Sequence, residues 1–138
     1  MKHALTYHLA EINRAVDFLI SHVNFGNIVA IYGDMGSGKT TLIKATVSKL
    51  RTEDSVSSPT FSIVNTYQTY GGIVHHFDLY RLNSTQELVD LGFDHYLDSD
   101  NLVLIEWPEL AQPLLPQNTV KLTILVNTDS SRSMFIEN

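Results

Sequence analysis

One short stretch of the sequence combines three glycines with a lysine and a threonine at its end. It reads, in order, Gly33, Asp34, Met35, Gly36, Ser37, Gly38, Lys39 and Thr40, followed by Thr41. Glycine adopts backbone angles that other residues resist, so main-chain N–H groups in such a stretch can close around phosphate oxygens. The lysine ammonium then reaches the β- and γ-phosphates, and the threonine hydroxyl becomes a magnesium ligand. We therefore expect residues 33–41, here called the glycine loop, to bind the phosphates of a nucleoside triphosphate.

The segments on either side of the glycine loop support this interpretation. Residues 28–32 form a continuous apolar run, which is typical of a strand buried on both faces. Residues 40–50 carry apolar side chains on one side of an expected helix. A helix that begins at the loop directs the positive end of its dipole at the same anion. A chance glycine turn would not be expected in this strand–loop–helix context.

Two carboxylates stand at the ends of predicted strands. Asp78 ends the apolar run 73–77, and Glu106 ends the run 102–105. Ligands of open α/β sheets gather at the carboxyl ends of the strands. One acid would hold a magnesium-bound water, while the other orients or deprotonates the attacking water. The residues alone leave open which acid has which role. For either acid, the alternative is a surface carboxylate at a strand end or an ion-pair partner of Arg81.

Three further residues lie near the expected site in the sequence. Thr60 lies in a Ser-Pro-Thr stretch after the second helix, where switch loops occur, so its hydroxyl is a candidate for the metal or the γ-phosphate. An ordinary turn is the alternative reading of that stretch. His75 and His76 are not expected to be metal ligands, because neighbouring residues of a strand point to opposite faces.

The remaining elements follow from periodicity and turn chemistry. Strands are expected at 5–9, 62–70, 73–79, 120–126 and 134–136, and helices at 10–23 and 84–92. Gly71 and Gly72 would turn a hairpin, and Ser84 with Glu87 fits a helix capping box. This pattern predicts an α/β fold of one domain, 1–138, with a mostly parallel central sheet and an antiparallel hairpin insertion.

Composition narrows the class of function. The net charge is −6, from 15 acidic and 9 basic residues, and the basic residues form no stripe along the chain. Direct binding of RNA or DNA is therefore not expected, and a role in nucleic-acid metabolism would run through a partner protein. The sequence has no apolar stretch of about 20 residues and no cysteine. A cytoplasmic protein that does not associate with membranes is the expectation.

Five segments in this order resemble the TsaE family, whose members act in bacterial tRNA threonylcarbamoyladenosine synthesis. The segments are GDMGSGKTT (33–41), SPTF (58–61), HFDLYRL (76–82), ELVDLG (87–92) and LIEWP (104–108). The resemblance implies a P-loop NTPase-like three-layer sandwich that binds ATP or ADP with Mg²⁺. It also implies weak ATPase activity alone, and action with a TsaD–TsaB-type complex that holds the tRNA and is reset by ATP hydrolysis.

Residue by residue, the resemblance implies that Lys39 binds phosphate, that Thr40 and Asp78 organise magnesium, and that Glu106 assists water attack. Glu106 is also a third candidate magnesium ligand, and Thr60 would belong to a switch-like loop. Three residues become candidates for the nucleotide-site rim or the partner surface: Tyr80, Arg81 and Trp107. Departures from the family pattern are Met35, Ser37 and the pair Ser131-Arg132, which leaves a contact between Arg132 and nucleotide open.

Two other functions fit a phosphate-binding loop. A small-molecule kinase usually places several arginines over the transferred phosphate, whereas this chain has four arginines and no cluster of them. A GTP-dependent switch protein would carry an Asn-Lys-x-Asp signature, which is absent. No motif marks an adenine pocket, and residues 6–11 are suspected only from their expected proximity to the glycine loop.

Overall fold

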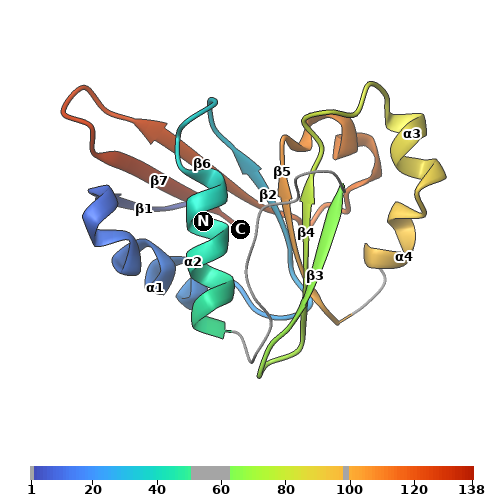
Figure 1. The fold of residues 1–138 in the computed structure, drawn as a ribbon, viewed down its shortest axis with the longest axis horizontal. Coiled ribbons are helices and arrows are strands. Elements are labelled where there is room, and N and C mark those ends of the chain that lie inside the picture. The colour runs from blue at the N-terminus through green and yellow to red at the C-terminus, as the bar shows by residue number, and fades with distance from the viewer. Residues whose placement is uncertain (1, 51–62, 98–99) are drawn as a thin grey trace.

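A computed structural model of the chain describes residues 2–50, 63–97 and 100–138. The strands within these ranges form one seven-stranded sheet in the order β1-β7-β6-β2-β5-β4-β3 (Figure 1). They are β1 (Lys2–Tyr7), β2 (Ile28–Tyr32), β3 (Val64–Gln68), β4 (Ile73–Asp78), β5 (Leu102–Glu106), β6 (Val120–Val126) and β7 (Arg132–Glu137). Strands β6, β2, β5 and β4 are parallel, whereas β3 and β7 pair antiparallel with their neighbours. The expected α/β fold is confirmed, and the sheet is mixed: its central strands are parallel, and antiparallel pairs flank them on both sides.

Helices cover both faces of this sheet. They are η1 (Leu9–Glu11), α1 (Ile12–His22), α2 (Lys39–Leu50), α3 (Thr85–Asp90), α4 (Phe93–Leu97) and η2 (Pro108–Leu114), where η denotes a 3₁₀ helix. Alternate residues of β5 point to opposite faces. Leu102 and Leu104 pack in one core cluster with α1 and α2, and Val103 and Ile105 pack in a second cluster with α3, α4 and η2. Figure 1 accordingly shows α1 beside α2, and α3 and α4 across the strands from them.

The N-terminal elements differ from the expected ones. The strand expected at 5–9 is β1, which ends at Tyr7 and pairs with β7 from Lys2↔Glu137 to Tyr7↔Arg132. The chain leaves the sheet at His8 because the Glu11 carboxylate accepts a hydrogen bond from the His8 N–H, at 3.1 Å. That contact fixes a 3₁₀ turn before α1, so the helix expected at 10–23 begins two residues later.

Most other predicted elements are found close to their expected bounds. Strand β2 and helix α2 flank the glycine loop, and β6 and β7 form the closing hairpin. Ser84 caps α3, since its Oγ accepts from the Glu87 N–H at 3.2 Å. The Glu87 carboxylate accepts from the Asn83 N–H instead of completing a capping box with Ser84. Helices α4 and η2 were not predicted. None of the described helices is long and apolar enough to cross a membrane.

Parallel pairing brings three strand ends together at one edge of the sheet. Ile31, one residue from the end of β2, pairs with Glu106, and Asp78 pairs with Glu106 from the other side. The glycine loop leaves β2 at this same edge. The topology therefore positions the loop and both predicted carboxylates around one region of space.

Candidate functional site

The glycine loop has a backbone that only glycine readily adopts at two positions. Gly36 has φ 81° and Gly38 has φ 100°, which lies in the left-handed region. A side chain at Gly33 is excluded for a different reason, because its Cβ would stand 2.6 Å from Ser37 Oγ and 3.0 Å from the Ile124 carbonyl oxygen. The loop runs into α2, a helix of 12 residues. Loop N–H groups and the dipole of a helix that follows them are the usual components of an anion site.

Ser37 lies at the inner side of this loop. Its hydroxyl is buried and finds no hydrogen-bond partner among the described residues. On the outer side, Arg132 of β7 donates from Nε to the Ser37 carbonyl oxygen at 3.4 Å. Arg132 therefore lies against the glycine loop, although the sequence left its place open.

Lys39 is folded back onto its own loop. Its Nζ donates a hydrogen bond to the Gly33 carbonyl oxygen at 2.6 Å and lies 3.4 Å from the centroid of the Trp107 ring. Only 5% of Lys39 is exposed. Burial lowers the pKa of its ammonium, and nearby carboxylates, Glu106 first among them, offset part of that effect.

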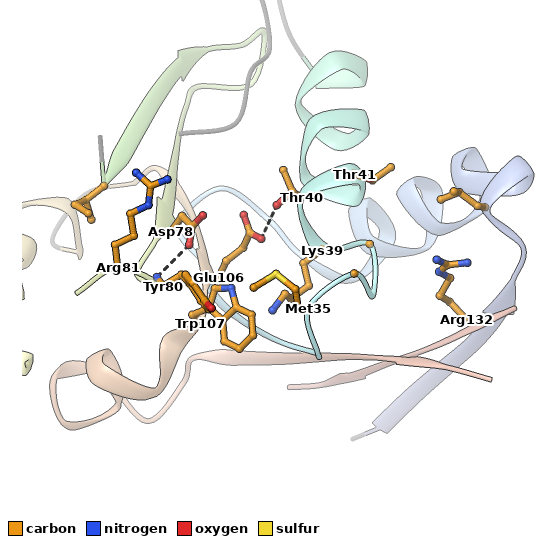
Figure 2. A pocket seen from close by; sticks show the side chains of 14 residues that line it. Met35, Lys39, Thr40, Thr41, Asp78, Tyr80, Arg81, Glu106, Trp107 and Arg132 are labelled. Carbon is orange, nitrogen blue, oxygen red and sulfur yellow. Dashed lines mark hydrogen bonds between the residues drawn. The ribbon is translucent and has the colours of Figure 1, made fainter. Parts of the chain in front are cut away.

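The two carboxylates lie side by side but make different contacts. Thr40 Oγ1 donates to Glu106 Oε1 at 2.7 Å, and Glu106 is buried. Asp78 is half-buried, and its Oδ1 accepts from the Tyr80 N–H at 3.1 Å. Figure 2 shows Thr40 reaching from α2 to Glu106, with Asp78 next to it. The hydroxyl predicted to bind magnesium thus touches Glu106 and not Asp78.

These residues surround a cavity of about 420 Å³. Its lining consists of Leu9, Met35, Gly36, Gly38, Lys39, Thr40, Thr41, Ile63, Asp78, Tyr80, Arg81, Glu106, Trp107 and Arg132. Asp78 and Arg81 lie at one end of the cavity and Arg132 at the other, with Lys39 and Trp107 between them (Figure 2). Of the glycine loop, Gly33, Asp34 and Ser37 are not part of this lining. Thr60 lies outside the described residues.

Two features of the site were not predicted from the sequence. His76 lies 2.6 Å from Glu106, measured from Nε2 to Oε2. Strand alternation puts His76 on the same face as Asp78, but its contact with Glu106 also depends on the register of β4 against β5, which no sequence pattern marks. The second feature is the backbone of Trp107, which has φ 54°, an uncommon value for a bulky residue. No pattern in the sequence marks that conformation.

The donor set fits a phosphate chain with a divalent cation. Loop N–H groups and the Lys39 ammonium would supply donors for phosphate oxygens. The Thr40 hydroxyl and the carboxylates of Glu106 and Asp78 are hard oxygen ligands of the kind that Mg²⁺ takes together with substrate phosphates. These donors and ligands are chemically compatible with a nucleotide and a bound divalent cation.

Comparison with known proteins assigns the chain to a family. Residues 6–134 match the model of the family described as "Threonylcarbamoyl adenosine biosynthesis protein TsaE". The chain is similar to the tRNA threonylcarbamoyladenosine biosynthesis protein TsaE of Haemophilus influenzae, with 39% identity over 78% of the chain and 66% of that protein. It is also similar to the protein of that name from Rickettsia felis, with 33% identity over 88% of the chain and 71% of the relative.

A third relative agrees with this assignment, and a solved structure shows the same fold. The TsaE protein of Bacillus subtilis is 34% identical over 79% of the chain and 68% of its own length. A crystal structure of Bacillus subtilis YdiB superposes with a TM-score of 0.73, covers 99% of this chain and 86% of that one, and is 24% identical, which shows the fold. With the family model matching almost the whole length, the chain belongs to the TsaE family.

Proposed function

We propose that the chain is a Mg-ATP-binding ATPase that serves tRNA threonylcarbamoyladenosine modification together with a TsaD–TsaB-type complex. The relatives named above carry that pathway in their names. The observation that carries the ATPase assignment is the hydrogen bond between Thr40 and the buried Glu106 at the mouth of the glycine loop. We further propose one P-loop NTPase-like three-layer domain, located in the cytoplasm.

Within this proposal, the loop N–H groups and Lys39 bind the β- and γ-phosphates, which requires the Lys39 ammonium to turn from Gly33 and Trp107 towards the nucleotide. Bound Mg²⁺ would neutralise charge on the phosphate oxygens. Thr40 and Glu106 would hold that ion, because the hydroxyl and the carboxylate already touch. Asp78 would then orient the attacking water. These roles of Asp78 and Glu106 are the reverse of those that the family resemblance implies.

The two ends of the cavity suggest the orientation of the nucleotide. Asp78 and Glu106 lie at the end where the terminal phosphate belongs. Thr41 and Arg132 lie towards the opposite end (Figure 2), so we assign that end to the nucleoside. Leu9 also lines the cavity. Leu9 falls within the residues 6–11 suspected from the sequence. Thr60 remains a proposed member of a switch-like loop.

The charge of the chain bears on its partners. A net charge of −6 disfavours direct contact with tRNA. We therefore assign tRNA binding to the partner complex, so that this chain contacts tRNA only indirectly. No role for DNA or for a membrane is part of the proposal.

Steady-state ATP hydrolysis, measured for the chain alone and with the TsaD–TsaB pair from the same source, tests the proposal. We expect slow turnover alone and a several-fold rise with the pair. Turnover that does not respond to the pair would contradict the partner assignment while leaving the nucleotide site intact. Titration with ATP and GTP in parallel checks the base, and a clear preference for GTP would contradict the ATP assignment.

A further inference from the structure

The buried contact between His76 and Glu106 has no role in the function proposed so far. His76 lies on β4 and Glu106 on the neighbouring strand β5, and the distance from Nε2 to Oε2 is 2.6 Å. Their side chains are 1% and 3% exposed. A buried carboxylate and a buried imidazole are rarely placed in contact without a hydrogen bond between them. This bond is therefore a fixed part of the site.

The two oxygens of Glu106 have different donors. Oε1 accepts from Thr40, at 2.7 Å, and Oε2 lies against His76. A carboxylate held at only one oxygen can rotate about its last side-chain bond, whereas one held at both cannot. From this we infer that His76 is a positioning residue, which fixes Glu106 Oε2 and thereby keeps Oε1 on the side of Thr40 and the cavity. This inference deepens the proposed function and rests on its assignment of Glu106.

The chemistry of the pair fixes which ring nitrogen carries the hydrogen. A carboxylate that takes part in metal binding is ionised, and an ionised carboxylate only accepts hydrogen bonds. His76 must therefore donate from Nε2 to Glu106 Oε2. Groups that hydrogen-bond a ligating carboxylate commonly affect metal affinity or activity by about 10- to 100-fold when they are removed.

A purely structural role for His76 is the competing explanation, and the neighbouring histidine provides the control. His75 lies on the same strand but points to the other face, where its ring contacts Thr66 Oγ1 at 2.8 Å, Asn101 Nδ2 at 3.0 Å and the edge of Tyr96. Neither His75 nor any of these three partners lines the cavity. A change at His75 therefore reports the effect of losing a β4 histidine that does not position Glu106.

Two amide substitutions separate positioning from packing. The amide nitrogen of Gln lies where Nε2 of histidine lies, whereas that of Asn lies nearer the position of Nδ1. His76→Gln can therefore still donate to Glu106 Oε2, and His76→Asn cannot reach it. Both variants, together with His75→Gln, are compared with wild type in melting temperature, in ATP affinity with Mg²⁺ and with EDTA, and in kcat and KM.

We expect His76→Gln to stay within about threefold of wild type and His76→Asn to lose about tenfold or more of both kcat and the gain in ATP affinity that Mg²⁺ provides. ATP affinity in EDTA should be the same in all variants, and His75→Gln should match wild type throughout. If His76→Asn behaves as wild type, or if both His76 variants fall equally, the positioning role is wrong.

A second measurement tests the inference without nucleotide. The ¹⁵N chemical shifts of the His76 ring in the free protein report which nitrogen bears hydrogen, and we expect a protonated Nε2. An unprotonated Nε2 would overturn the inference even if ATP binding is normal. Failure of the wild-type chain to bind ATP would instead contradict the proposed function, while the ring spectrum still tests the contact with Glu106.

Discussion

Two loops leave neighbouring parallel strands at the same edge of the sheet and face the same cavity, yet they are built on different principles. The glycine loop after β2 turns through Gly36 and Gly38 at positive φ and offers mainly its backbone N–H groups. The chain after β5 turns through Trp107 at φ 54° and offers side chains. The ring of Trp107 lies over Lys39 and contacts Tyr80, at 5.0 Å between centroids.

The difference shows how each loop is held in shape. Glycine adopts the left-handed region without steric strain, so the first loop needs few side-chain contacts to keep its conformation. Tryptophan adopts that region at a cost, which its surroundings must offset. The contacts of the Trp107 ring with Lys39 and Tyr80 supply that packing. The first loop is therefore suited to binding, and the second to holding Glu106 and the cavity wall in a defined place.

The largest expected effects come from changing Lys39, which should alter ATP affinity, and Glu106, which should alter kcat. Lys39→Ala should weaken ATP affinity by about 100-fold, because it removes a charge-assisted contact worth about 1.5–3 kcal/mol. Glu106→Gln should lower kcat by about 100-fold while ATP affinity in EDTA stays within threefold of wild type. Calorimetric titration and steady-state hydrolysis measure the two effects.

Val89→Ala, an exposed position on α3 outside the cavity, is the control for these variants. Wild-type ATP affinity in Lys39→Ala would show that the glycine loop is not the binding site. Glu106→Gln could instead lower ATP affinity and kcat equally, with ATP affinity lost in EDTA as well. Glu106 would then be a structural support of the glycine loop, and the distinction between a binding loop and a loop that positions Glu106 would not hold.

A smaller effect is expected on stability when the residues with positive φ in the two loops are changed. Trp107→Gly should be more stable than Trp107→Ala by about 1 kcal/mol, since glycine relieves a left-handed conformation that alanine retains. At Gly38, with φ 100°, alanine should be less stable than glycine by a similar amount. Urea unfolding measures all three. If Trp107→Ala is as stable as Trp107→Gly, the backbone at this position is not strained and the two loops do not differ in the way described.

The first loop was predictable from sequence and the second was not, for a physical reason. Glycine at fixed spacing between an apolar strand and a helix reports a backbone requirement directly. Strand ends could likewise be read from apolar runs, which placed Asp78 and Glu106 at one edge because parallel strands share it. The left-handed turn at Trp107 depends on tertiary contacts with Lys39 and Tyr80, and no local pattern encodes those.

Tertiary contacts and short element length account for the other differences between expectation and structure. Register across the β4–β5 pair decides that His76 reaches Glu106, and register is a property of two segments far apart in the sequence. Helix α4 and the 3₁₀ helix η2 are short, and their apolar residues follow no long helical period, so periodicity could not find them. Arg132 comes near the glycine loop only because β7 pairs with β6 beside β2.

The smallest effect concerns the charge that the two loops enclose. Because burial lowers the pKa of Lys39, the folded chain disfavours its charged form relative to the unfolded chain. Lys39→Met keeps the length of the side chain without the charge, and near neutral pH it should raise the melting temperature by about 1–3 °C.

The size of this advantage should depend on pH. Between the lowered pKa of Lys39 and about 10.4, the unfolded chain binds more protons than the folded one, so wild-type stability rises with pH. The advantage of Lys39→Met should therefore shrink through this window, as followed by thermal unfolding of both proteins at a series of pH values. A constant or growing advantage would mean that the ammonium is stabilised, not disfavoured, between the Gly33 carbonyl and the Trp107 ring, and that the second loop closes over Lys39 as a favourable partner.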